Sequence, residues 1–198
     1  QMNTLKAEKR SMDVKAKKLR REGFVTGNLF GREIEGSIPL KFTKKEIEVL
    51  LKNNNKGSQV MLELDGKTYD ALIKEVDYNP LAHTVEEVDF QALVSNEMVH
   101  STAEIILENE EKVMSGVLQD ELKEVAYKAL PADLVDKIKV DVAGMKIGDT
   151  LRVKDLEIAK NKNIHITTDP EAVVATVTPV HNVVPETETE AEETAEEK

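Results

Sequence analysis

Alternation of apolar and polar positions predicts short β-strands in the first half of the chain. Every second residue from Val60 to Leu64 is apolar, which is the period of a half-buried strand. Asp65-Gly66 follows, and a further apolar run extends from Tyr69 to Val76. An Asp-Gly pair between two such runs indicates a hairpin, because both turn positions need a positive φ. Val85 to Val94 predicts another strand.

One segment between these strands has helical spacing instead. Thr43 to Glu46 has the pattern of a capping box, and apolar residues follow at positions 47, 49, 50 and 51. The Thr and Glu side chains of such a box satisfy free N–H groups at a helix start. We therefore expect a helix from Lys44 to about Asn53, ended by the residues up to Gly57, which tolerate left-handed geometry.

A second β-rich region begins near Ser95. Ile138 to Val142 alternates apolar and charged residues, and Val173 to Val177 is continuously apolar or small before Pro179. Gly144 and Gly148 mark turns between them. Short strands with regular turn signals predict a second, all-β domain.

Composition narrows the class of protein. Hydrophobic residues make up 40% of the 198 residues and aromatic residues only 4%, so the expected core is aliphatic. The absence of Cys excludes disulfides and thiolate metal sites, and it favours the reducing cytoplasm. No apolar run has the length of a membrane span, and no signal peptide is evident.

Charge is distributed unevenly along the chain, whose formal net charge is −11. Residues 1–23 carry eight basic and three acidic side chains, whereas residues 94–198 carry a net charge of −12. Residues 185–198 hold seven Glu and one Lys with no large apolar side chain. They cannot bury enough surface to offset chain entropy, so we expect a disordered acidic tail.

Patterns typical of enzymes are missing. None of the four histidines lies three or four residues from another, so no helical metal pair exists. The sequence also lacks a phosphate-binding loop and a nucleophile elbow. We expect no enzyme activity, no cofactor, no bound metal and no small-molecule substrate.

The basic N-terminal segment is the strongest functional signal. Lys15, Lys17, Lys18, Arg20 and Arg21 fall within seven positions, and in a helix positions 17, 20 and 21 share a face with position 18 beside them. Leu19 would then point inward. Charge alone leaves two interpretations open: a solvated helix face, or a patch that contacts phosphates.

Several motifs resemble one bacterial ribosomal family. KKLRREG (17–23) with LFG (29–31) is similar to the opening of large-subunit ribosomal protein twenty-five, whose long form is also called general stress protein Ctc. Further similar segments are 75–80, Val88-Asp89-Phe90 and the stretch 130–156, which is the most specific. The closing VVATVTP (173–179) and the acidic tail also look like the long form. The resemblance covers almost all of residues 4–185.

This resemblance implies a mainly β protein whose N-terminal domain is a small β-barrel with short helices. The domains would be 4–93, the barrel; 94–184, an all-β C-terminal domain; and 185–198, the tail. The implied partners are 5S rRNA and the large ribosomal subunit, in the cytoplasm and away from any membrane. The implied rRNA-binding residues are Arg10, Lys15, Lys17, Lys18, Arg20, Arg21, Phe30, Tyr78 and Asp89.

The chain departs from the family pattern at several positions, some of which face RNA in that family. Thr26 and Phe30 stand where the family usually has Pro and Tyr. Asp77-Tyr78 replaces Gln-Arg, and Glu87 replaces His. These changes remove donors and add negative charge opposite phosphates. The alternative hypothesis is therefore a diverged stress-type paralogue with weak or lost 5S rRNA binding, which acts as a protein-interaction module.

Overall fold

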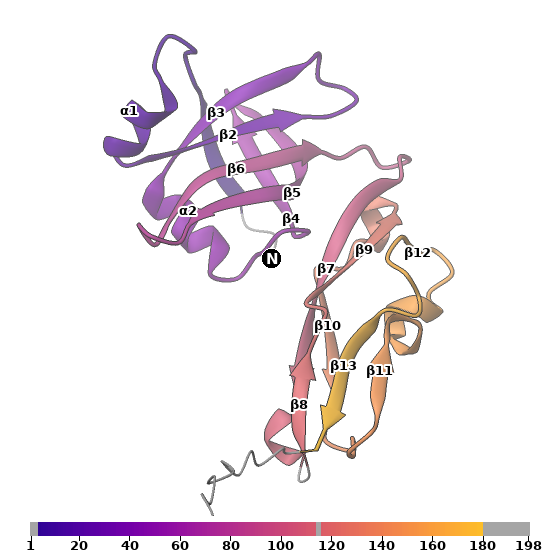
Figure 1. Cartoon of the computed structure of the whole chain (residues 1–198). Coiled ribbons are helices and arrows are strands. Elements are labelled where there is room, and N and C mark those ends of the chain that lie inside the picture. The colour runs from indigo at the N-terminus through magenta and orange to yellow at the C-terminus, as the bar shows by residue number, and fades with distance from the viewer. Residues whose placement is uncertain (1–3, 114–115, 180–198) are drawn as a thin grey trace, which may run out of the picture.

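Most of the regular structure in the described residues is β. The computed structural model describes residues 4–113 and 116–179, and it contains a closed six-stranded barrel followed by two smaller sheets (Figure 1). The expected mainly β class, with an N-terminal barrel and a second β region, is confirmed. The predicted disordered acidic tail, 185–198, and the last residues of the predicted second domain lie outside the described residues.

Some strands that pair in the barrel are consecutive in the sequence, and others are far apart in it. The barrel order is β1-β3-β2-β6-β5-β4, closed by parallel pairing of β1 with β4. The Asp65-Gly66 turn has φ values of 51° and 76°, so the predicted hairpin is confirmed. The strands are β1 (Thr4–Lys9), β2 (Phe24–Phe30), β3 (Ser37–Thr43), β4 (Gln59–Leu64), β5 (Lys67–Asn79) and β6 (Thr84–Ala92).

Two short helices join these strands, α1 (Ala16–Arg21) and α2 (Lys44–Leu51). The predicted capping box is present, since Thr43 accepts from the Glu46 backbone and Glu46 accepts from Thr43. The helix ends at Leu51, two residues earlier than expected. The backbone amides of Asn53 and Asn54 both donate to the Leu50 carbonyl, and the Asn54 side chain caps it as well.

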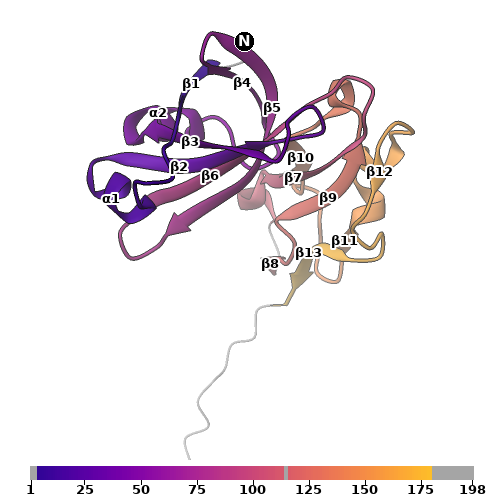
Figure 2. The ribbon, with the colours of Figure 1, turned by 90° about the horizontal axis from the view of Figure 1, so that it is seen from above.

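The barrel core is aliphatic, as the low aromatic content predicts. Leu29, Leu40, Leu62 and Ile47 are fully buried there. Phe90 is also buried, and its ring centroid lies 5.4 Å from that of Phe42. Ile47 comes from α2, so that helix covers one part of the barrel (Figure 2).

The second β region has two sheets with a core of their own. One has the strand order β10-β7-β9-β12 and the other β11-β13-β8. Tyr127 is buried between them, and its hydroxyl both donates to the Val135 carbonyl and accepts from the Val135 amide, each at 2.7 Å. The strands are β7 (Val99–Glu108), β8 (Val117–Asp120), β9 (Glu124–Ala129), β10 (Lys137–Asp141), β11 (Thr150–Arg152), β12 (His165–Ile166) and β13 (Val173–Thr178). Short 3₁₀ turns lie at Glu110–Lys112, Pro131–Asp133, Val153–Asp155 and Glu157–Lys160.

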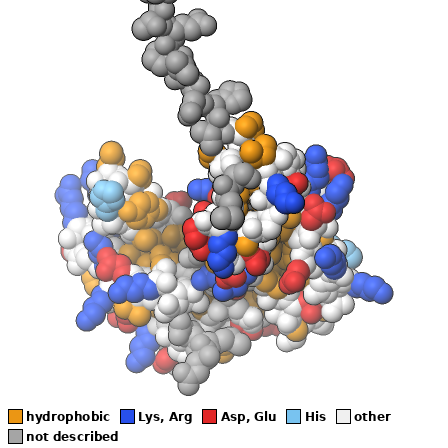
Figure 3. All heavy atoms as spheres, turned by 90° about the horizontal axis from the view of Figure 1, so that it is seen from below, with side chains coloured by type: hydrophobic (Ala, Val, Ile, Leu, Met, Phe, Trp, Pro, Cys, Tyr) orange, Lys and Arg blue, Asp and Glu red, His pale blue; other side chains and the backbone are white. Residues whose placement is uncertain are grey.

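Surface charge is mixed over much of the molecule. Lys and Arg side chains lie among Asp and Glu side chains on the face shown in Figure 3. Several exposed pairs account for this, such as Lys139 with Glu108 at 2.6 Å and Lys154 with Glu171 at 2.7 Å. Exposed pairs of this kind contribute about 0–1 kcal/mol each. In residues 4–113 and 116–179, no helix is long and apolar enough to cross a membrane.

The loop between α2 and β4 joins the barrel to the second β region. The Asn55 amide side chain donates to the Glu104 carboxylate on β7. The Ser58 hydroxyl donates to Asp136 at 3.1 Å. The tightest approach between the two regions is at Gly57, where an added Cβ would lie 1.9 Å from the Thr102 carbonyl oxygen on β7. The two regions are therefore docked through a backbone contact that leaves no room for a side chain.

Replacing Gly57 with Ala is expected to separate the two regions and to lower stability. Gly57 has a φ of +90°, and the added methyl group would meet backbone atoms that cannot turn aside. The matched control is Gly66→Ala, where φ is +76° but no atom lies within 4 Å. We expect about 1 kcal/mol of destabilisation in the control and at least about twice that at Gly57. Thermal denaturation and the radius of gyration measure the difference. Equal midpoints and equal radii in the two variants would contradict the docking described above.

Candidate nucleic-acid interface

Helix α1 carries the predicted basic segment on the outside of the barrel. Its single buried side chain is Leu19, which fixes the helix against the barrel as predicted. Lys18, Arg20 and Arg21 occupy the last turn, where positive charge is favoured by the helix dipole. The helical form and the inward position of Leu19 are thus confirmed.

Arg20 is held by internal partners. Its Nε donates to the Glu86 carbonyl at 3.1 Å, and its two terminal nitrogens each lie 3.3 Å from a carboxylate oxygen, of Glu86 and of Glu87. The Thr26 hydroxyl lies 3.4 Å from the guanidinium and itself donates to the Glu86 carbonyl at 3.3 Å. Arg20 therefore fixes α1 to β6, and its charge is largely balanced inside the protein.

The other four basic residues of the segment point to solvent. Their only ion pair in the described chain joins Lys18 to Glu22 at 3.9 Å, a spacing of one helical turn, and such pairs contribute about 0.3–0.5 kcal/mol. Within residues 4–113 and 116–179 the rest make no ion pair. We call these four residues the α1 cations; they are Lys15, Lys17, Lys18 and Arg21.

Arg10 lies in the approach to this helix and is half-buried. One terminal nitrogen donates to the Val14 carbonyl at 3.1 Å, and so helps to shape the turn that leads into α1. Its Nε is buried and has no hydrogen-bond partner in the described chain. Arg10 therefore contributes to the position of α1 as well as to local positive charge.

The outer surface of β5 and β6, which adjoins α1, is acidic. In the strand register Asp77 lies opposite Glu87, and Glu75 lies opposite Asp89. Like charges that face each other across strands are destabilising. We call these four residues the acidic face.

Hydrogen bonds from β2 partly stabilise this acidic face. Asp89 accepts from the Asn28 backbone at 2.9 Å and from its side chain at 3.0 Å, and the same side chain lies 3.2 Å from Glu87. Burial raises the pKa of Glu87, and Asp89 and Asp77 raise it further, while Arg20 and Arg10 oppose the rise. Negative charge on Glu87 is therefore poorly stabilised.

The two predicted aromatic contacts lie at different places on the barrel. Phe30 is half-buried at the end of β2, about 20 Å along the strand from Phe24, which follows α1. Tyr78 is 53% exposed near the tip of the β5–β6 hairpin, and its hydroxyl lies 3.2 Å from the His83 ring. The structure thus brings Arg20, Glu87 and Asp89 together, and places Phe30 at the other end of β2.

Sequence reasoning missed two residues that shape this surface. Asn28 and Glu86 bind the side chains that the sequence did single out. No local signal points to them, because Arg20 and Glu86 are 66 residues apart. Only the pairing of β2 with β6 places them side by side.

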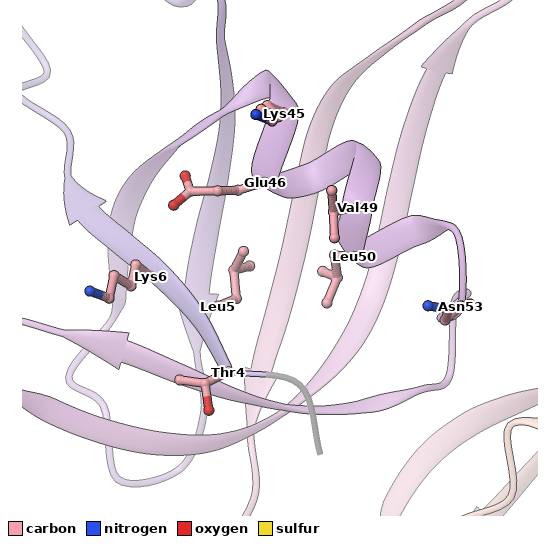
Figure 4. A pocket seen from close by; sticks show the side chains of 8 residues that line it. All are labelled: Thr4, Leu5, Lys6, Lys45, Glu46, Val49, Leu50 and Asn53. Atoms are coloured by element: carbon pink, nitrogen blue, oxygen red, sulfur yellow. The ribbon is translucent and has the colours of Figure 1, made fainter. Parts of the chain in front are cut away.

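One hollow in the described part of the chain lies away from this surface. It has a volume of about 470 Å³ and lies between β1 and α2. Leu5, Val49 and Leu50 turn toward it, with Lys6 and Glu46 nearby (Figure 4). None of the predicted site residues lines it, and no group of three acidic or histidine ligands in the described chain has the geometry to hold a metal ion.

Comparison with known proteins matches both β regions. The model of the Ribosomal L25p family matches residues 5–90, and the model of the ribosomal protein TL5 C-terminal domain matches residues 98–181. A protein of Caldanaerobacter subterraneus named large ribosomal subunit protein bL25 is 30% identical over 196 residues, which is 98% of each chain. The bL25 protein of Carboxydothermus hydrogenoformans is 32% identical over 190 residues, 91% of this chain and 94% of its own.

The chain belongs to the bL25 family.

Membership of the bL25 family confirms the resemblance found in the sequence. It also confirms that the chain is not an enzyme, since the bL25 relatives are ribosomal structural proteins. The bL25 match covers the α1 cations and the acidic face together, because both lie within residues 5–90. The predicted contacts with 5S rRNA stay predictions at this point.

Proposed function

We propose that the chain is a structural component of the large ribosomal subunit that binds 5S rRNA through the α1 cations. Family membership supports a role in the large ribosomal subunit. We accordingly expect the protein to act in the cytoplasm. The observation that carries the RNA contact is the cluster of solvent-facing positive charge on α1 in a chain whose net charge is −11. A surface that is only solvated gives no reason for these largely unpaired cations to be gathered on one short helix.

The geometry supports a docking role that depends on shape. Leu19 and Arg20 fix the helix to the barrel, so its free cations are presented on a rigid element. Each phosphate that they contact releases counterions, and this release contributes affinity that does not depend on the RNA sequence. Folded RNA helices are recognised mostly through backbone and shape. In this proposal Arg20 acts mainly as a positioning residue.

The acidic face favours a second candidate function. Four carboxylates lie on two adjacent strands beside α1, and Arg20 is already engaged with Glu86 and Glu87. RNA that approached this part of the barrel would meet negative charge. A diverged paralogue with weak or lost 5S rRNA binding, acting as a protein-interaction module, would have such a surface.

Direct binding of 5S rRNA decides between the two candidates. The full chain is titrated into labelled 5S rRNA at low salt, with an unrelated RNA of the same length as competitor. The first candidate predicts a complex that the unrelated RNA displaces only at a large excess. Absence of any complex at low salt would exclude it and leave the second.

The variant Glu87→Gln is expected to bind 5S rRNA about fivefold more tightly at neutral pH, the effect of roughly 1 kcal/mol from one nearby surface charge. The pKa of Glu87 is raised above its ordinary value of 4.5. Glu87 therefore loses its negative charge at a higher pH than an ordinary Glu, as the pH falls through that raised pKa. Affinities measured from pH 7 to pH 4.5 should show the advantage of the variant shrinking toward the acidic end. An advantage that stays constant with pH, or none at all, would show that Glu87 does not face the RNA.

A further inference from the structure

Positive charge also collects where the two β regions meet. A crevice of about 200 Å³ lies at this junction. The barrel contributes Lys56 and Lys74 to its lining, and β7 contributes His100 and Thr102. None of these residues belongs to the surface assigned to 5S rRNA above.

The strand register extends this cluster into a row of basic side chains. His100 on β7 lies directly opposite Lys128 on β9, and Lys128 lies directly opposite His165 on β12. All three side chains are on the exposed side of the sheet. Because directly opposed residues have Cβ atoms about 5 Å apart, the row extends over roughly 10 Å. We call Lys74, His100, Lys128 and His165 the junction row.

Lys74 connects the row to the barrel. Its Nζ donates to the His100 carbonyl oxygen at 2.7 Å. Burial lowers the pKa of Lys74, and Lys56 lowers it further. The pKa of His100 is also lowered, by desolvation and then by Lys128 and Lys74. Positive charge is therefore crowded at this place.

Nearby carboxylates do not balance the crowding. Glu124 on β9 pairs with Lys56 at 3.5 Å, and Glu104 on β7 accepts from Asn55. Within residues 4–113 and 116–179, Lys74 and Lys128 form no ion pair. An acidic chain that leaves these ammonium groups without carboxylates has a site suited to an external anion.

We propose that the junction row binds phosphates of an RNA backbone. The row is open along its length and longer than a single phosphate group, and its two lysines and two imidazoles are all donors once the histidines are protonated. The inference rests on the proposed function, because a ribosomal protein meets RNA as its main partner. It makes the joint between the two regions a second RNA contact, independent of α1.

The test is the pKa of His100 in the full chain, measured by NMR with and without RNA. A bound phosphate stabilises the imidazolium form, so the pKa of His100 should rise by about half a unit or more. His165 should move in the same direction. Three probes are compared: 5S rRNA, an unrelated RNA duplex and inorganic phosphate.

A variant supports the NMR measurement. Lys128→Gln removes one charge on an exposed strand position and breaks no hydrogen bond or ion pair of the described chain. It should weaken RNA binding about threefold to tenfold and reduce the salt slope by about one. Lys123→Gln is the matched control, because it removes one exposed charge from the same region and should leave both quantities unchanged.

Each outcome bears on one proposal or the other. Binding of 5S rRNA with unmoved histidines and an unchanged Lys128→Gln affinity would overturn the junction contact and leave the proposed function standing. A rise in the His100 pKa with the unrelated duplex, but no 5S rRNA complex, would support the junction contact and contradict 5S binding. An equal rise with inorganic phosphate alone would identify a site for free anions and overturn the RNA assignment. No response to any probe would overturn the junction contact outright.

Discussion

The variant Gly27→Ala is expected to destabilise the barrel strongly. Gly27 lies in the middle of β2, where a Cβ would be 2.0 Å from the Val88 carbonyl oxygen and 3.3 Å from the Phe42 ring. The Val88 oxygen is backbone of β6, which pairs with β2, so one of the two strands must shift. Overpacking of a tight core costs about 1–3 kcal/mol, and a collision with backbone at this distance should reach or exceed the upper value.

Urea denaturation followed by circular dichroism measures this effect. Gly144→Ala is the control, because no atom lies within 4 Å of its added Cβ and its backbone is not left-handed. The control should keep the midpoint of the parent chain. A Gly27→Ala barrel as stable as the control would contradict the close approach of β2 and β6. Separation of these strands would also detach Arg20 from Glu86, so RNA binding should fall with stability.

Removing the α1 cations has the largest expected effect on function. Four phosphate contacts, each contributing about 1 kcal/mol, correspond to a loss of about 1000-fold in 5S rRNA affinity at low salt. Leu19 and Arg20 are left in place, so the helix should keep its position. The variant carries four substitutions: Lys15→Gln, Lys17→Gln, Lys18→Gln and Arg21→Gln.

A control with the same change in net charge separates local contact from general attraction. All four of its lysines are exposed and lie away from α1 in the sequence. A gel-shift titration of both variants against 5S rRNA should show strong loss only for the first. Equal losses would mean that net charge, and not α1, attracts the RNA. The control substitutions are Lys45→Gln, Lys52→Gln, Lys123→Gln and Lys146→Gln.

Much of the fold could be predicted because local signals agree with it. The capping box at Thr43, the Asp65-Gly66 turn and the alternation around Leu62 each determine structure within a few residues. The closure of the barrel could be inferred only through family resemblance, since it depends on β1 pairing with β4. Such pairing joins residues that are far apart in sequence, and no local pattern encodes it.

The candidate site was predictable only in part, for a related reason. The charge of α1 can be read from the sequence directly. The engagement of Arg20 cannot, because its partners Glu86 and Glu87 lie on β6. The same holds for the junction row, in which Lys128 lies between His100 and His165 only after three strands have paired. Residue types could be recognised in advance, whereas their partners depended on strand register.

The salt dependence of 5S rRNA binding by the unmodified chain tests the central claim most directly. The logarithm of the association constant is plotted against the logarithm of salt concentration. Four phosphate contacts from the α1 cations alone predict a slope of about −2.8 to −3.6, because each contact contributes roughly −0.7 to −0.9, and further contacts at the junction row would make the slope steeper. A slope near zero, or no binding at low salt, would contradict the account.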